Sequence, residues 1–229
     1  PGENAIKIGF KRLAHTFREL GDFRELMIFL VSLFFAMAGL SIVISFAFIY
    51  GHQVIRWDDN SRVLMFIITQ FTAAGGALLF GYLQDFIGAK KTFNLTLILW
   101  IIAVFLIWAT EEVTLFIINS FSWSLENQTF FLMVGCLAGM GLGATQSASR
   151  AIVGLFSPES KSAEFFGFWG LSGKLAAIVG LLAIGLMQKI FGLQNAILIC
   201  SVFFLFALIV NFLVSYSRGI EVAKRHQGE

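Results

Sequence analysis

The chain has 229 residues, of which 58% are apolar and only 13% are charged. A soluble domain carries about 25% charged residues, so this composition excludes an ordinary soluble protein and indicates a membrane protein. The net charge of +2 is too small for a nucleic-acid-binding protein, and the sequence has no basic patch interleaved with aromatic residues. We therefore expect the lipid bilayer, and no nucleic acid, as a partner.

The first segment of the chain has the pattern of an amphipathic helix. In IGFKRLAHTFREL, residues 8–20, four apolar residues share one helical face: Phe10, Leu13, Phe17 and Leu20. This pattern predicts a helix in the cytoplasmic interface, acting either as a plain linker or as a regulatory, lipid-sensing element. Because the chain begins Pro-Gly-Glu, without Met or a signal peptide, we expect it to be a piece of a longer protein.

Apolar windows along the chain predict six membrane-spanning helices. Each is long enough to cross a hydrocarbon core of about 30 Å, and the backbone groups of a chain in lipid must bond within their own helix. The expected spans are Leu26–Gly51, Val63–Phe86, Phe93–Thr110, Phe130–Phe156, Phe165–Ile190 and Asn195–Ser217. We therefore divide the chain into a linker (1–23), a six-helix domain (24–217, with triplets 24–110 and 128–217) and a tail (218–229).

The basic residues predict how these spans are oriented. Eleven of them fall at one side of the expected membrane: Lys7, Lys11, Arg12, Arg18, Arg24, Lys90, Lys91, Lys161, Arg218, Lys224 and Arg225. The other side has Arg56, Arg62 and Lys189, and a long loop with Glu111, Glu112 and Glu126. The positive-inside rule then places both termini in the cytoplasm. We expect a multi-pass protein of a bacterial inner membrane.

Two stretches of the chain repeat at an offset of 104 residues. GYLQDFIG, residues 81–88, aligns with GLMQKIFG, residues 185–192, and the same offset aligns Gly76 with Gly180 and Gly39 with Gly143. Each copy has three expected spans, so the second copy enters the membrane in the opposite sense. The sequence thus predicts an all-α integral membrane fold made as a 3+3 inverted repeat, which is a building principle of secondary transporters.

The connection between the second and third spans carries a motif of its own. It is made of Gly81, Asp85, Gly88, Lys90 and Lys91 in GYLQDFIGAKKT, and it resembles the loop signature of the major facilitator superfamily. The usual pattern is Gly, three residues, Asp, two residues, Gly and then basic residues. The position after the second glycine is commonly basic, and it is alanine in this chain.

A second stretch, residues 141–180, resembles the C-terminal half of the autophagy-related vacuolar effluxer-like permeases. The likeness is carried by Gln146, by Ser149-Arg150, by SAEFFGF from Ser162 and by SGK from Ser172. It implies a transporter half, not an enzyme, that moves a small solute, such as an amino acid or a related metabolite, by alternating access. Its partner would be the missing N-terminal half, or a second copy of the chain in a homodimer.

The same resemblance gives the loop motif a role. The motif would act as a cytoplasmic latch, in which Gly81 and Gly88 permit close backbone approach and Asp85 faces a helix of the other half. The alternative from the residues alone is that Asp85 only caps the turn that contains Lys90 and Lys91.

Few ionisable residues lie inside the expected spans, and each is therefore a candidate functional residue. Lys174 is near the middle of the fifth span and is expected either to line an aqueous cavity, where it meets an anionic substrate group, or to pair or snorkel. Arg150 and Glu164 flank the fourth-to-fifth cytoplasmic loop at similar depths, which predicts an ion pair, acting either as a static clamp or as a state-dependent gate. Gln146 lies one turn before Arg150, and Gln70 aligns with Lys174 at the repeat offset. These five residues are the expected substrate path.

Other classes of site find no support in the pattern. Cys136 and Cys200 lie in apolar runs and indicate buried small side chains. No spacing predicts a metal site, a cofactor or a catalytic group.

The series Gly135, Gly139 and Gly143 predicts close helix packing. The alternative to a half-transporter is a stand-alone six-helix protein that self-associates as a channel, scaffold or lipid-handling protein.

Overall fold

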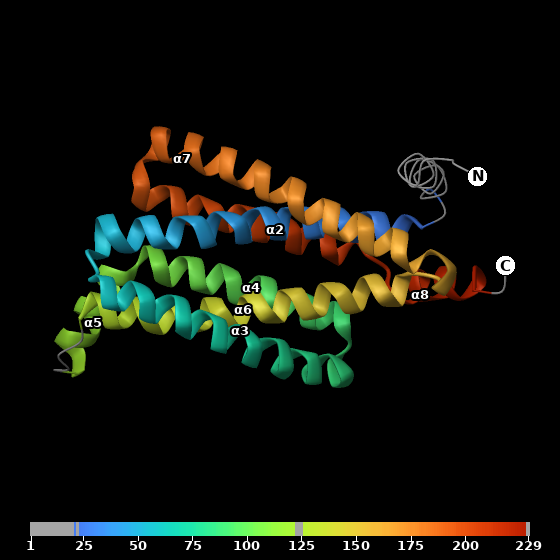
Figure 1. Ribbon diagram of the computed structural model, residues 1–229, viewed down its shortest axis with the longest axis horizontal. Coiled ribbons are helices and arrows are strands. Elements are labelled where there is room, and N and C mark those ends of the chain that lie inside the picture. The colour runs from blue at the N-terminus through green and yellow to red at the C-terminus, as the bar shows by residue number, and fades with distance from the viewer. Residues whose placement is uncertain (1–20, 22, 122–125, 228–229) are drawn as a thin grey trace, which may run out of the picture.

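A computed structural model describes residue 21 and the ranges 23–121 and 126–227, so the predicted amphipathic segment lies outside the described residues. All regular structure in these ranges is helical (Figure 1). Two short elements, the π-helical turn η1 (Gly51–Ile55) and the 3-10 turn η2 (Glu159–Lys161), accompany the α-helices. The α-helices are α2 (Arg24–Tyr50), α3 (Asp59–Ile87), α4 (Ala89–Trp108), α5 (Thr110–Phe121), α6 (Asn127–Phe156), α7 (Ser162–Phe212) and α8 (Tyr216–Arg225).

Five helical stretches are long and apolar enough to cross a membrane. They are α2 with η1, α3, α4, α6, and α7 with η2. Figure 1 shows them as one elongated bundle, in which α2 and α6 run in opposite directions and the described ends of the chain lie at the same end. The expected class, an all-α membrane protein, is confirmed.

The helix α7 contains both of the last two expected spans. Its 51 residues would extend about 75 Å if straight, far more than the hydrocarbon core of about 30 Å. The backbone leaves the helical region at Gly192, with φ 77° and ψ 169°, and Figure 1 shows α7 turning back on itself. The turn falls between the expected spans, which end at Ile190 and begin at Asn195.

We predict that Gly192→Ala destabilises the protein while Gly185→Ala on the same helix does not. No atom lies within 4 Å of a Cβ built at either glycine, so the pair differs in backbone conformation alone. The region that Gly192 occupies is essentially restricted to glycine, and another residue there costs about 1–3 kcal/mol. Thermal unfolding in detergent should show a lower Tm for Gly192→Ala only. Equal Tm values for the two variants would contradict the role of Gly192.

Two segments differ from the expected structure. The stretch expected as a long outer loop contains α5, in which Glu111 and Glu112 occupy the first turn, where acidic side chains favour the helix dipole. The expected cytoplasmic tail contains α8, which packs on the end of α6. A Cβ at Gly219 would lie 2.6 Å from the Phe156 ring, so α8 approaches closely through this glycine. Both segments are short helices with polar residues, and the search for long apolar windows missed them.

Close packing in the bundle depends on glycines, as expected. α2 packs chiefly against α7, and α3 packs chiefly against α6. A Cβ at Gly143 would lie 1.8 Å from the Ala73 carbonyl oxygen, and one at Gly180 would lie 2.6 Å from the Ala38 carbonyl oxygen. Helices can approach this closely only where the side chain is absent.

The last part of α7 and the helix α4 bury residues at matching positions. The six buried residues after Gly192 each follow a buried residue of α4 by 104 positions. At the centre of this match, the ring of Trp100 stacks on that of Phe204, with centroids 5.4 Å apart and planes 3° from parallel. The matched pairs are Thr92 and Ala196, Phe93 and Ile197, Thr96 and Cys200, Trp100 and Phe204, Ala103 and Ala207, and Ile107 and Asn211.

Candidate functional site

A cavity of about 390 Å³ lies between α2, α6 and α7. Polar side chains from all three helices line it, which is uncommon on helices as apolar as these. Its lining residues are Met37, Leu40, Ser41, Gln146, Arg150, Trp169, Gly170, Gly173, Lys174 and Ala177. The structure thus brings together three of the five expected substrate-path residues: Gln146, Arg150 and Lys174.

Lys174 enters the cavity from a face of α7 made of small residues. Gly170, Gly173 and Ala177 flank it, and no atom lies within 4 Å of a Cβ built at either glycine. These glycines leave open space, whereas Gly180 further along α7 is in tight contact. Lys174 is exposed, and in the described part of the chain no carboxylate forms an ion pair with it. Its ammonium group is available to a solute in the cavity.

Arg150 is held by an aromatic contact. Its guanidinium carbon lies 5.0 Å from the centroid of the Trp169 ring, a cation–π contact. The Trp169 indole N–H in turn donates to the hydroxyl oxygen of Ser149, at 3.1 Å. The structure thus places the Arg150 guanidinium over Trp169, and the expected ion pair with Glu164 stays a prediction.

The other two expected path residues lie elsewhere. Glu164 is half-buried in the first turn of α7, and Gln70 is exposed on α3. Neither is among the residues that line this cavity. Sequence reasoning missed Trp169, although a tryptophan five residues before a lysine inside an apolar span was a signal that could have identified it.

The loop motif forms the junction between α3 and α4. Gly88 has φ 86° and ψ 148°, a backbone conformation that favours glycine. No atom lies within 4 Å of a Cβ built there, so contacts within this chain do not require a glycine at this position. A Cβ built at Gly81 would lie 3.5 Å from the Ser147 hydroxyl oxygen, which is ordinary contact. Asp85 is exposed, and no side chain caps the start of α4, so the capping alternative for Asp85 is not what the structure shows.

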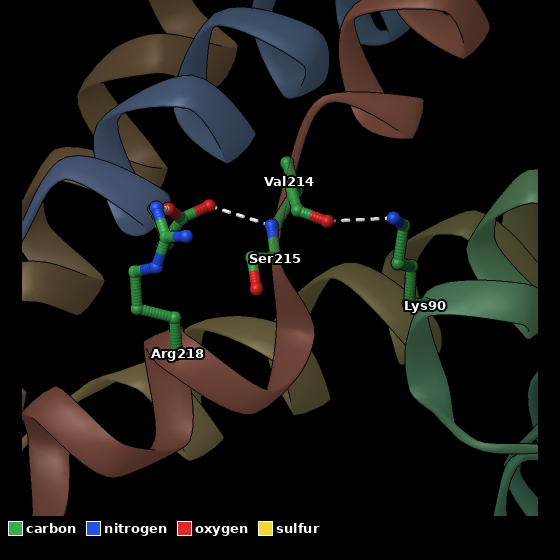
Figure 2. Close-up of polar contacts among 5 residues, drawn as sticks. Lys90, Val214, Ser215 and Arg218 are labelled. Atoms are coloured by element: carbon green, nitrogen blue, oxygen red, sulfur yellow. Dashed lines mark hydrogen bonds and ion pairs between the residues drawn. The ribbon is translucent and has the colours of Figure 1, made fainter.

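Lys90, the first of the two lysines of this motif, contacts the chain at the end of α7, a role that the sequence did not suggest (Figure 2). Lys90 Nζ donates to the carbonyl oxygen of Val214 at 2.6 Å and to that of Phe212 at 3.2 Å. On the opposite side, the buried carboxylate of Glu25 accepts from the Ser215 N–H at 2.6 Å and from Arg218 at 3.2 Å. The link between α7 and α8 is therefore held from both sides.

We predict that Lys90→Met destabilises the junction of α7 and α8, while Lys91→Met has little effect. Lys90 bonds two carbonyl groups that intrahelical bonding leaves free, and hydrogen bonds to a charged group contribute about 1.5–3 kcal/mol. Lys91 is exposed, and Lys91→Met removes the same charge from the same end of the bundle. Hydrogen exchange over residues 213–216 should accelerate in Lys90→Met alone. Equal exchange in the two variants would count against the contact.

Comparison with known proteins identifies relatives over almost the whole chain. The family model described as "Vacuole effluxer Atg22 like" matches residues 1–224. An uncharacterized MFS-type transporter, YxiO of Bacillus subtilis, is 24% identical over 205 residues, which are 90% of this chain and 42% of that protein. Autophagy-related protein 22 of Candida glabrata is 23% identical over 231 residues, 97% of this chain and 41% of that protein. No solved structure matches the chain.

The relatives agree with the resemblance found in the sequence. Autophagy-related protein 22 of Kluyveromyces lactis is 24% identical over 226 residues, 97% of this chain and 44% of that protein. The chain thus spans about two fifths of the length of these relatives. None of these relatives is named as an enzyme. The match of the family model over residues 1–224 shows that the chain belongs to the Atg22-like vacuole effluxers, a family with MFS-type transporters among its relatives.

Proposed function

We propose that this chain is one half of a secondary transporter and moves a small solute by alternating access together with a second six-helix half. The observation that carries the proposal is the cavity between α2, α6 and α7, where Lys174 and Arg150 meet in an otherwise apolar bundle. Ionisable residues at such places mark substrate pathways in membrane proteins. The family of the chain supports the same conclusion.

The bundle is proposed to be a 3+3 inverted repeat. Three observations at the offset of 104 residues support it. Gly88 and Gly192 are the two glycines with positive φ in the described chain. The buried residues of α4 recur after Gly192. Trp100 stacks on its own counterpart, Phe204, as residues near a local two-fold axis would. The opposite directions of α2 and α6 agree with this arrangement (Figure 1).

The second half is proposed to cover the open side of the bundle, with a second copy of this chain as the alternative. Only 17% of the most apolar stretch of α3 is buried, and Phe71 and Leu78 are 76% and 77% exposed. Asp85 is exposed in the last turn of α3. It is therefore available to a helix N-terminus of the other half, as a latch requires.

The substrate is proposed to carry a carboxylate or a similar anionic group, as an amino acid or related metabolite does. Lys174 and Arg150 give the cavity two cations, and its described lining includes no carboxylate. An amino acid bound here would place its carboxylate near these cations, and its ammonium group would need acceptors from the other half. This half would then supply the anion-binding part of the site.

We also propose that both ends of the described chain face the cytoplasm. Seven described basic residues lie at that end of the bundle, against Arg56, Arg62 and Lys189 at the other, which agrees with the positive-inside rule. The bacterial relative is in keeping with an inner membrane. The seven residues are Arg24, Lys90, Lys91, Lys161, Arg218, Lys224 and Arg225.

Flux measurements on the complete protein test the proposed function. The protein would be reconstituted in liposomes and supplied with pools of radiolabelled amino acids, organic anions, and solutes without an anionic group, such as sugars and amines. We expect saturable flux of at least one solute with an anionic group. Flux restricted to solutes without such a group would refute the proposed substrate class, and no saturable flux of any solute would refute the transporter.

A further inference from the structure

A second cavity, of about 340 Å³, lies between α2 and the opposite face of α7. Phe168, Leu171 and Leu175 line it, and at 100° per residue they point about half a turn away from Gly173 and Ala177 of the polar cavity. The two cavities therefore lie on different sides of α7. We call the second one the outer groove, and it is separate from the proposed substrate path.

The lining of the outer groove suits a hydrocarbon chain. Val31 of α2 and Leu171 and Leu175 of α7 are 45%, 53% and 48% exposed, so the surface is open and apolar. The one hydroxyl group among the described lining residues, that of Ser172, already donates to the Leu30 carbonyl oxygen at 3.3 Å. Nothing in this lining offers a partner to a polar solute.

The length and position of the groove match one leaflet of a membrane. On α2 the lining runs from Met27 to Phe35, which is about 12 Å at 1.5 Å per residue. Half of a hydrocarbon core is about 15 Å. The groove begins one turn from the start of α2, so it opens at the level where lipid headgroups meet the acyl chains.

Cationic side chains lie at this end of the groove. Arg24 precedes Met27 by three residues and Val31 by seven, so it lies on the same face of α2 as the lining. It is exposed, and in the described ranges it forms no ion pair. Lys161 Nζ lies 5.8 Å from the ring centroid of Phe23, which precedes Arg24 in the chain. The other charged groups nearby are the ion pair of Glu25 with Arg218, Glu159 in η2, and Glu164 at the start of α7.

We propose that the outer groove binds one acyl chain of an anionic phospholipid, with the lipid phosphate at Arg24. The bundle end that carries Arg24 is also the more basic end, and the cytoplasmic leaflet, which basic residues favour, is the one rich in anionic lipids. The charge at the mouth selects the headgroup, and the apolar lining holds the chain.

Native mass spectrometry of the complete protein tests this site. The protein would be taken from membranes with equal amounts of phosphatidylglycerol and phosphatidylcholine. We expect more phosphatidylglycerol adducts on the wild type, and about fivefold fewer on Arg24→Gln, since one basic residue near the surface is worth about 1 kcal/mol. Lys91→Gln removes the same charge away from the groove and should match the wild type.

Filling the groove separates the lipid from other occupants. Leu175→Trp, or Val31→Phe if the first variant does not fold, should reduce the adducts of both lipids. Equal lipid preference in Arg24→Gln and Lys91→Gln would overturn the headgroup site. Unchanged adducts in the filled variants, with assembly of the two halves lost, would show that the other half occupies the groove and would overturn the proposal.

Discussion

Replacing Lys174 by alanine is expected to lower transport by the complete protein about 10- to 100-fold, with no change in Tm. A hydrogen bond from a charged group contributes about 1.5–3 kcal/mol, and 1.4 kcal/mol corresponds to a factor of ten. Lys174 is exposed in the cavity, and its ammonium group has no ion pair in the described chain, so its loss should not disturb the bundle. Initial rates of liposome flux over a range of substrate concentrations would measure the effect.

Two further variants identify the cause of that effect. Lys174→Arg keeps the charge and should retain part of the flux. Lys189→Ala removes an exposed lysine from the same helix, outside the cavity, and should transport as the wild type does. Flux by Lys174→Ala equal to that of Lys189→Ala would remove Lys174 from the substrate path, while leaving the transporter itself unaffected.

Gly143→Ala is expected to destabilise the bundle by about 2–3 kcal/mol, in the upper range for overpacking. A Cβ at this position would lie 1.8 Å from the Ala73 carbonyl oxygen and 2.9 Å from the Ala77 nitrogen. Both are backbone atoms of α3, so no side-chain rotation can relieve the clash, and α3 and α6 must separate. Thermal unfolding followed by size-exclusion chromatography in detergent would measure the loss.

Gly154→Ala is the matched control on α6. The nearest atom to a Cβ there is at the tip of the Phe166 ring, 3.9 Å away, which is ordinary contact. Because alanine favours a helix over glycine by about 1 kcal/mol, this variant should be as stable as the wild type or more so. If Gly143→Ala unfolded at the same temperature as Gly154→Ala, the close contact of α3 and α6 would be wrong.

Much of the fold could be predicted because the lipid bilayer restricts the backbone to few conformations. A run of about twenty apolar residues is stable in lipid as a helix, so such runs identify the spans in the sequence. The boundary expected between Ile190 and Asn195 falls where the backbone of α7 turns back at Gly192, so the two helical segments of α7 correspond to the last two expected spans. α5 and α8 escaped prediction because their stability comes from packing at the ends of the bundle, and length and hydropathy do not report such contacts.

The candidate site was predictable in composition and not in geometry. Lys174, Arg150 and Gln146 were identified because charge and amide groups are costly in a span, and the structure places all three on one cavity. Glu164 and Gln70 were grouped with them by depth and by repeat offset, and neither measure fixes the direction in which a helix faces. The bonds of Lys90 to Phe212 and Val214 join residues 122 and 124 positions apart, which only the fold brings together.

The parallel rings of Trp100 and Phe204 restrict how the bundle can deform. Stacked aromatic rings add about 0.5–1.5 kcal/mol beyond the area they bury, and sliding α4 along the last part of α7 would lose that contact. Tilting the bundle as one body leaves the rings in register. A bundle held by such a contact at its centre can tilt as a rigid body relative to a neighbouring domain without a change in its own packing.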